Sequence, residues 1–90
     1  MPRKYTTSKN FDRILVRLQK KDKQLYENLA NKMNEILNTP DVEHYKNLRH
    51  DMKDLKRVQI GHFVLVFRYD KFVDFIYFED FDHHDNIYKK

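Results

Sequence analysis

The 90-residue sequence contains no cysteine or tryptophan, one glycine and two prolines. Without cysteine, neither disulfide bonds nor thiolate zinc sites can reinforce the fold, and such a composition fits a reducing cytosol. The longest apolar run, residues 63–67, is far too short to span a bilayer, and no apolar stretch follows the N-terminal residues. We therefore expect a soluble, cytoplasmic protein in which residues 1–90 form a single domain.

Basic residues are unevenly distributed along the chain, whose formal net charge is +4. Residues 1–25 carry eight Lys or Arg against two acidic residues, and residues 46–71 carry seven against three. The rest of the chain is acidic. If the two basic segments share a face, that face suits a polyanion such as a nucleic acid. The alternative is that these cations lie on ordinary solvated helix faces, which is the commoner arrangement.

The spacing of apolar residues predicts a short strand followed by two helices. Residues 3–7 have β-prone character. Apolar side chains then recur every three or four positions over residues 11–18 and again over residues 25–37, which predicts two amphipathic helices. Ser8 is placed to cap the first helix and Asp22 the second. Two such helices joined by a tight turn form an antiparallel pair that can cover one face of a sheet.

The second half of the chain changes from a helical to a strand period. After a loop over residues 41–54, alternation predicts an antiparallel meander of three strands, at residues 55–60, 63–69 and 72–78. Gly61-His62 suits a two-residue type II′ hairpin, and Asp70-Lys71 is predicted to form a second tight turn. The last two strands are apolar on both faces, so we expect a partner or another segment to cover the face away from the helices. The predicted fold class is α+β.

Two groups of side chains after residue 48 carry most of the chemistry in the sequence. The first group consists of Arg49, Lys53, Lys56 and Arg57. These side chains either bind phosphates or are ordinary solvated side chains of a loop and an edge strand. The second is the tail that runs from His83-His84 to Tyr88. Adjacent residues on an extended strand point to opposite faces, so only one of these imidazoles is expected to serve a proton-transfer site. The alternative is a pair of exposed polar residues.

Two further possibilities concern the same tail. Tyr88 can stack on a nucleobase, or it can anchor the end of the core. Histidines and carboxylates crowd together over residues 79–85, but they lack both a helical His-x-x-x-His pair and a cysteine partner. We therefore predict no metal site and no cofactor.

The order strand, helix, helix and three-stranded meander, with the hairpin LKRVQIGHFVLVF at residues 55–67 and the box HHDNIY at residues 83–88, resembles the RelE/ParE superfamily of toxins. The resemblance covers nearly the whole chain and is strongest to the RelE-type branch. It implies a toxin of a type II toxin–antitoxin module that cleaves messenger RNA, usually on the ribosome. It also implies a small RelB-like antitoxin as partner.

The resemblance assigns roles to individual positions. Arg57 matches a basic residue of the first meander strand, whereas Gln59 and Val64 stand where the family has cations. His84 replaces a terminal arginine, as in some branches of the family, and Tyr88 matches the closing aromatic. The implied catalytic residues are therefore Arg57 for phosphate stabilisation, His84 as proton donor and Tyr88 to stack on or orient the base. The implied substrate-binding residues are Arg49, Lys53 and Lys56.

The reaction implied by this assignment needs no metal. The RNA 2′-hydroxyl attacks the adjacent phosphorus, cations stabilise the crowded equatorial oxygens and an acid protonates the departing 5′-oxygen. Because the set of cations is reduced, we expect the ribosome to position the RNA, since orientation alone can supply roughly 7 to 11 kcal/mol. Two alternatives remain, a ParE-like toxin that inhibits DNA gyrase by protein contacts and a basic RNA-binding module. The nuclease interpretation requires Arg57 and His84 to share one concave surface.

Overall fold

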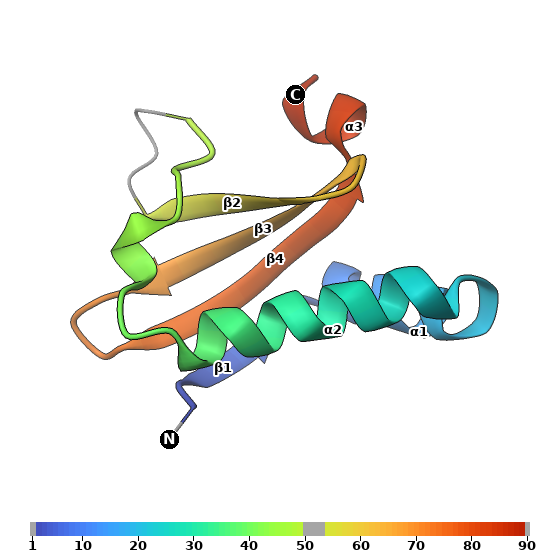
Figure 1. The fold of residues 1–90 in the computed structure, drawn as a ribbon. Coiled ribbons are helices and arrows are strands. Elements are labelled where there is room, and N and C mark those ends of the chain that lie inside the picture. The colour runs from blue at the N-terminus through green and yellow to red at the C-terminus, as the bar shows by residue number, and fades with distance from the viewer. Residues whose placement is uncertain (1, 50–53, 90) are drawn as a thin grey trace.

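The computed structural model describes residues 2–49 and 54–89 and shows a four-stranded sheet with two long helices on one face (Figure 1). Along the chain the elements are β1 (Lys4–Thr7), α1 (Lys9–Lys21), α2 (Lys23–Asn38), a 3₁₀ turn (Val42–His44), β2 (Leu55–Ile60), β3 (Phe63–Asp70), β4 (Phe75–His83) and α3 (His84–Tyr88). The predicted α+β class, helix pair and antiparallel meander are confirmed.

Both long helices begin at the predicted caps. The Ser8 hydroxyl accepts a hydrogen bond from the backbone N–H of Phe11 at 3.0 Å, and the Asp22 carboxylate accepts one from that of Leu25 at 3.1 Å. Each cap satisfies a backbone donor that the first helical turn leaves unpaired. Ser8 also donates to the carbonyl of Glu79, which ties the start of α1 to β4. Within the described residues no helix has the length and apolar character that crossing a membrane requires.

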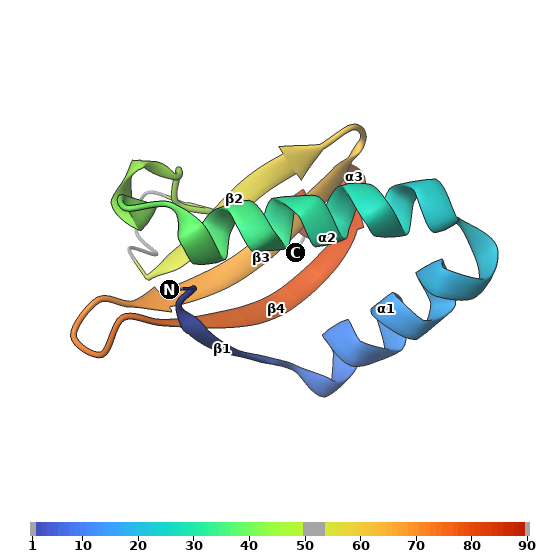
Figure 2. The same ribbon diagram turned by 60° about the horizontal axis from the view of Figure 1, so that its bottom comes forward.

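The strand order in the sheet is β1-β4-β3-β2. β2, β3 and β4 form the antiparallel meander, whereas β1 pairs parallel with β4, from Lys4 opposite Phe75 to Thr7 opposite Phe78. Figure 2 shows β1 alongside β4, with α1 leading away from the end of β1 and α2 running back across the sheet. The two antiparallel ladders and the parallel pair therefore place β4 inside the sheet.

The main core lies between the helix pair and the sheet. Its fully buried side chains come from both layers and include Phe11, Leu29, Ile36, Leu65, Phe67, Ile76 and Phe78. A smaller cluster covers the opposite face, where Val64 and Val66 of β3 pack with Ile87 of α3. The chain itself therefore covers part of this face, for which the sequence predicted either a partner or another segment as cover.

The turn between β3 and β4 is longer than predicted, and the predicted start of the last strand at residue 72 is wrong. Asp70 pairs with Phe75, and residues 71–74 form the turn. The Asp70 carboxylate accepts a hydrogen bond from the N–H of Phe72 at 3.0 Å, and Asp74 adopts a positive φ of 54°. Phe72 is 90 % exposed. Its apolar, β-prone character misled the sequence analysis, because local turn bonding by aspartates outweighs that preference.

The turn between β2 and β3 agrees with the prediction. Ile60 pairs with Phe63, so the loop has two residues, Gly61 and His62. Gly61 has a φ of 61° and His62 lacks a positive φ, which is the pattern that a type II′ turn requires. This turn brings His62 to the end of the sheet where α3 begins.

Candidate active site

Arg57 and Tyr88 lie together on the face of the sheet opposite α1 and α2. Arg57 is on β2 directly across from Val66, so its side chain lies on the α3 side of the sheet. Its guanidinium carbon lies 6.0 Å from the centroid of the Tyr88 ring, a cation–π arrangement. The backbone N–H of Arg57 donates to the carbonyl of Lys46 at 2.9 Å, which fixes this part of β2. A cation and an aromatic surface are thus adjacent.

His84 is the first residue of α3, four positions before Tyr88. Residues four apart on a helix lie on the same side, so His84 is one turn away from the ring that contacts Arg57. The Nδ1 atom of His84 lies 3.0 Å from a carboxylate oxygen of Asp85. Its backbone N–H donates to the carbonyl of His62 at 2.9 Å, which ties α3 to the β2–β3 turn. The structure therefore brings Arg57 and Tyr88 into contact and places His84 one helical turn before Tyr88.

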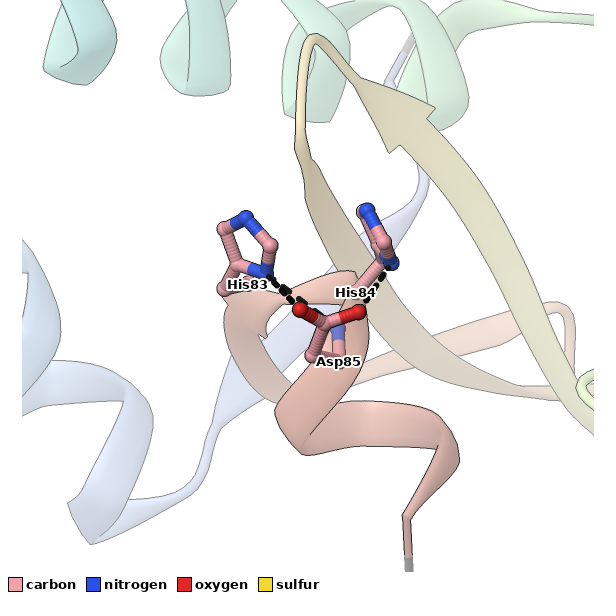
Figure 3. Close-up of side chains that lie close together, drawn as sticks. All are labelled: His83, His84 and Asp85. Atoms are coloured by element: carbon pink, nitrogen blue, oxygen red, sulfur yellow. Dashed lines mark hydrogen bonds and ion pairs between the residues drawn. The ribbon is translucent and has the colours of Figure 1, made fainter.

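His83 and His84 lie side by side, so the prediction that they point to opposite faces is wrong. β4 ends at His83, and the chain turns into α3 at His84, so the extended geometry behind the prediction does not apply. The two ring centroids are 4.5 Å apart, and both imidazoles face Asp85 (Figure 3). The Nδ1 atom of His83 accepts a hydrogen bond from the N–H of Asp85 at 3.2 Å and so caps α3.

His62 is a third imidazole of this cluster, and the sequence analysis did not identify it. Its ring centroid lies 6.1 Å from that of His83 and 6.4 Å from that of His84. A signal for it was present in the meander itself, because the antiparallel register places Phe63 opposite His83. His62, which precedes Phe63, must then lie near His84, which follows His83.

Lys56 lies on the other face of the sheet from Arg57. Its side chain is buried, with 3 % exposure, and its ammonium donates to the carbonyl of Tyr45 at 3.2 Å and to the side-chain oxygen of Asn47 at 3.1 Å. Lys56 is directly across from the core residue Phe67. Since neighbouring strand residues face opposite ways, Lys56 and Arg57 do not face a common ligand. The structure gives Lys56 a structural role, and its side chain is not part of the surface formed by Arg57 and Tyr88.

Of the two other predicted substrate-binding residues, Arg49 is among the described residues and Lys53 lies outside them. Arg49 is exposed and lines a groove on the α3 side of the sheet, together with Leu55, Val66 and Ile87. Arg49 therefore lies on the same face as Arg57, within reach of a chain that follows this surface.

Gln59 and Val64, which stand where the resemblance predicts cations, differ in burial. Gln59 is exposed, and its side chain donates to the carbonyl of Gly61 at 2.9 Å. Val64 is 2 % exposed and packs with Ile87. A charged side chain at position 64 would lose this contact, so Val64 helps to anchor α3 and the two functional side chains that α3 carries.

Comparison with known proteins gives clear relatives. None of the known protein-family models matches the sequence. A Methanocaldococcus jannaschii protein named "Putative toxin RelE4" is 51 % identical over 82 residues, which cover 90 % of this chain and 85 % of the relative. An uncharacterised Methanosarcina mazei protein is 48 % identical over 73 residues, which cover 80 % of this chain and 83 % of that protein.

Solved structures of low sequence identity share the fold. The toxin–antitoxin complex RelBE2 of Mycobacterium tuberculosis contains a chain that matches with a TM-score of 0.70 at 16 % identity, over 93 % of both chains. The E. coli toxin RelE, as a double arginine-to-alanine mutant in the free state, matches with a TM-score of 0.70 at 18 % identity, over 99 % of this chain and 93 % of RelE. Taken with the close relative of the same family name, these matches show that the chain belongs to the RelE-type branch of the RelE/ParE toxin superfamily.

Proposed function

We propose that this protein is the toxin of a type II toxin–antitoxin module and that it cleaves messenger RNA. The observation that carries the proposal is the placement of the Arg57 guanidinium 6.0 Å from the Tyr88 ring, with His84 one helical turn before Tyr88. A cation, an aromatic ring and an imidazole on one surface are the groups that RNA cleavage through the 2′-hydroxyl uses.

Each of the three side chains has a separate role in the proposed reaction. The 2′-hydroxyl releases its proton to water, its oxygen forms a bond to the adjacent phosphorus, and the bond from phosphorus to the 5′-oxygen breaks. Arg57 stabilises the negative charge on the equatorial phosphate oxygens, because a guanidinium donates paired hydrogen bonds to phosphate. Protonated His84 donates a proton to the departing 5′-oxygen. Tyr88 stacks on a neighbouring base, an interaction worth about 1–3 kcal/mol per base.

Asp85 supports the role of His84. With its carboxylate 3.0 Å from Nδ1, Asp85 fixes the orientation of the ring. The other ring nitrogen, Nε2, is then the atom that exchanges a proton with the RNA. The exposed Arg49 on the same face extends the positive surface along the RNA chain. Lys53, one of the residues predicted from the sequence, is a further candidate for such a phosphate contact.

The proposed partners are the ribosome and an antitoxin, and the proposed location is the cytoplasm. With few cations at the site, we expect ribosomes to position the messenger RNA and to raise the cleavage rate. A RelB-like antitoxin is proposed because the solved relative of M. tuberculosis is a toxin–antitoxin complex. A peptide that folds on the α3 side of the sheet would block Arg57.

The test is cleavage of messenger RNA on purified ribosomes by the wild type and by matched variants. His84→Gln removes the proton donor and is expected to lower the rate by about 100-fold or more. Arg57→Gln removes the phosphate contact and is expected to lower it by about 100-fold as well. Arg13→Gln changes an exposed arginine of α1 and serves as the charge-matched control. Equal rates for H84Q and wild type would remove His84 from the mechanism.

Expression of the toxin in cells separates the nuclease proposal from its rival. Growth arrest with cut messenger RNA supports the proposal, and co-expression of the antitoxin encoded next to it should restore growth. Growth arrest with DNA damage and intact messenger RNA would instead identify a ParE-like inhibitor of DNA gyrase. Salt-dependent RNA binding without any toxicity would reduce the protein to an RNA-binding module.

A further inference from the structure

We propose that His62, His83, His84 and Asp85, hereafter the imidazole cluster, form a binding site for a divalent transition metal of the zinc class. The cluster combines residues of the β2–β3 turn with residues at the junction of β4 and α3. The sequence predicted no metal site because residues 79–85 lack both a helical His-x-x-x-His pair and a cysteine partner. The structure adds a third imidazole from the β2–β3 turn, and it places the rings of His83 and His84 on one side, because the helix begins at His84 (Figure 3).

The distances between the donor atoms are close to those that a metal requires. Ligand atoms of His83, His84 and Asp85 all lie within 4.8 Å of one another. Zinc–nitrogen bonds of 2.0–2.1 Å in a tetrahedral arrangement hold neighbouring donor atoms about 3.3 Å apart. The His83 and His84 side chains are 38 % and 41 % exposed, so they can rotate to close this difference. Three protein ligands are therefore available to one ion through rotation of their side chains.

His62 is the fourth ligand candidate, because its ring neighbours both other imidazoles. Its centroid lies 6.1 Å from that of His83 and 6.4 Å from that of His84. The hydrogen bond from the N–H of His84 to the carbonyl of His62, and the pairing of Phe63 with His83, keep the two segments together. The protein thus holds the ligand-bearing segments in place before any metal binds, which lowers the entropic cost of binding.

The donor set selects the class of metal. Imidazole nitrogens suit zinc, nickel and copper, whereas magnesium and calcium prefer sites built from oxygen ligands. Three imidazoles and one carboxylate therefore favour zinc-class ions over magnesium. Asp85 supplies the negative charge that partly compensates the charge of the metal.

One consequence of the site rests on the proposed nuclease function. A metal bound to His84 occupies a nitrogen of the imidazole that is proposed to donate a proton to the RNA. We therefore expect the metal-bound protein to cleave RNA more slowly, and a chelator to restore the rate.

The direct test measures metal binding without RNA, so it does not depend on whether the protein cleaves RNA. Tag-free protein is titrated with Zn²⁺ by calorimetry, and with Co²⁺ by visible absorption, which reports the ligand geometry. His83→Gln and His62→Gln are each expected to weaken Zn²⁺ binding by about tenfold or more. His44→Gln is the matched control, because His44 is exposed and belongs to the 3₁₀ turn, away from the cluster. Circular dichroism checks that each variant is folded.

The outcomes separate the possibilities. Stoichiometric Zn²⁺ binding that H83Q and H62Q weaken, and that H44Q leaves unchanged, supports the site. Absence of Zn²⁺ binding to the wild type, or equal weakening by H44Q, overturns it. In the cleavage assay, the rate without Zn²⁺ divided by the rate with Zn²⁺ should be smaller for H62Q than for the wild type. An equal ratio would overturn the link to cleavage, while the binding data still decide whether the site exists.

Discussion

The contact between Arg57 and Tyr88 can be measured as a coupling free energy in a double-mutant cycle. The guanidinium lies 6.0 Å from the ring centroid, and Tyr88 is 45 % exposed. A cation–π pair at an exposed site contributes about 0.5–1 kcal/mol to stability. We therefore expect Arg57→Gln and Tyr88→Leu to be non-additive by about this amount. The apolar contact of the neighbouring Ile87 is unchanged in every variant, so it cancels in the cycle.

The assay is urea unfolding of the wild type, the two single variants and the double variant at one pH and one salt concentration. Tyr88→Phe keeps the aromatic face, so its cycle with Arg57→Gln should be nearly additive. Tyr88→Leu removes the aromatic face, so its cycle should be non-additive. Tyr5 is a matched control because it is 50 % exposed and lies on β1, at the opposite edge of the sheet from β2. A cycle of Arg57→Gln with Tyr5→Leu should be additive to within about 0.3–0.5 kcal/mol.

The result that would refute the reasoning is a coupling between Arg57 and Tyr88 no larger than that of the Tyr5 control. The guanidinium would then not be held over the ring in solution, and the site would lack the preformed geometry on which the nuclease proposal depends. A cycle of Arg57→Gln with Tyr88→Phe that shows the same coupling as the Tyr88→Leu cycle would also refute it, because phenylalanine keeps the aromatic face and its cycle should be nearly additive.

Three other variants test the assignments of the remaining side chains. Lys56→Met should cost about 1–3 kcal/mol in unfolding free energy, because it removes both buried hydrogen bonds, and should leave RNA cleavage by the folded fraction unchanged. Phe67→Ala removes a ring with 0 % exposure and should cost about 3–5 kcal/mol by urea unfolding. Hydrogen bonds from Tyr69 and then Arg3 lower the pKa of Asp74 below its ordinary value of 3.8. This stabilisation is complete above that value and is lost as the pH falls through the lower, folded-state pKa, so Asp74→Asn should flatten the loss of stability below about pH 4 in urea titrations.

The elements that the sequence predicted correctly are those with a repeating pattern. α1 and α2 have apolar residues at helical spacing and side-chain caps at Ser8 and Asp22, so both their existence and their starts follow from local chemistry. The β2–β3 hairpin follows from the single glycine, Gly61, whose conformation the turn requires. Local signals of this kind do not depend on the rest of the fold.

The features that the sequence did not predict depend on long-range pairing or on competition between local signals. The parallel pairing of β1 with β4 joins residues about seventy positions apart, and no local pattern in residues 4–7 specifies its partner. The start of α3 at His84 decides that both histidines lie on one side, but α3 is only five residues long and has no repeat to reveal it. The burial of Lys56 was implied by strand alternation, yet the positive charge favoured a surface role.

The position of β4 inside the sheet has a consequence for incomplete polypeptides. β4 is the last strand along the chain, but it separates β1 from β3 and supplies Ile76, Phe78 and Phe81 to the main core. A product that stops before residue 75 therefore leaves β1 without a neighbour and opens the centre of the molecule to water. We therefore expect premature termination or proteolytic cleavage before β4 to leave an unfolded, inactive fragment.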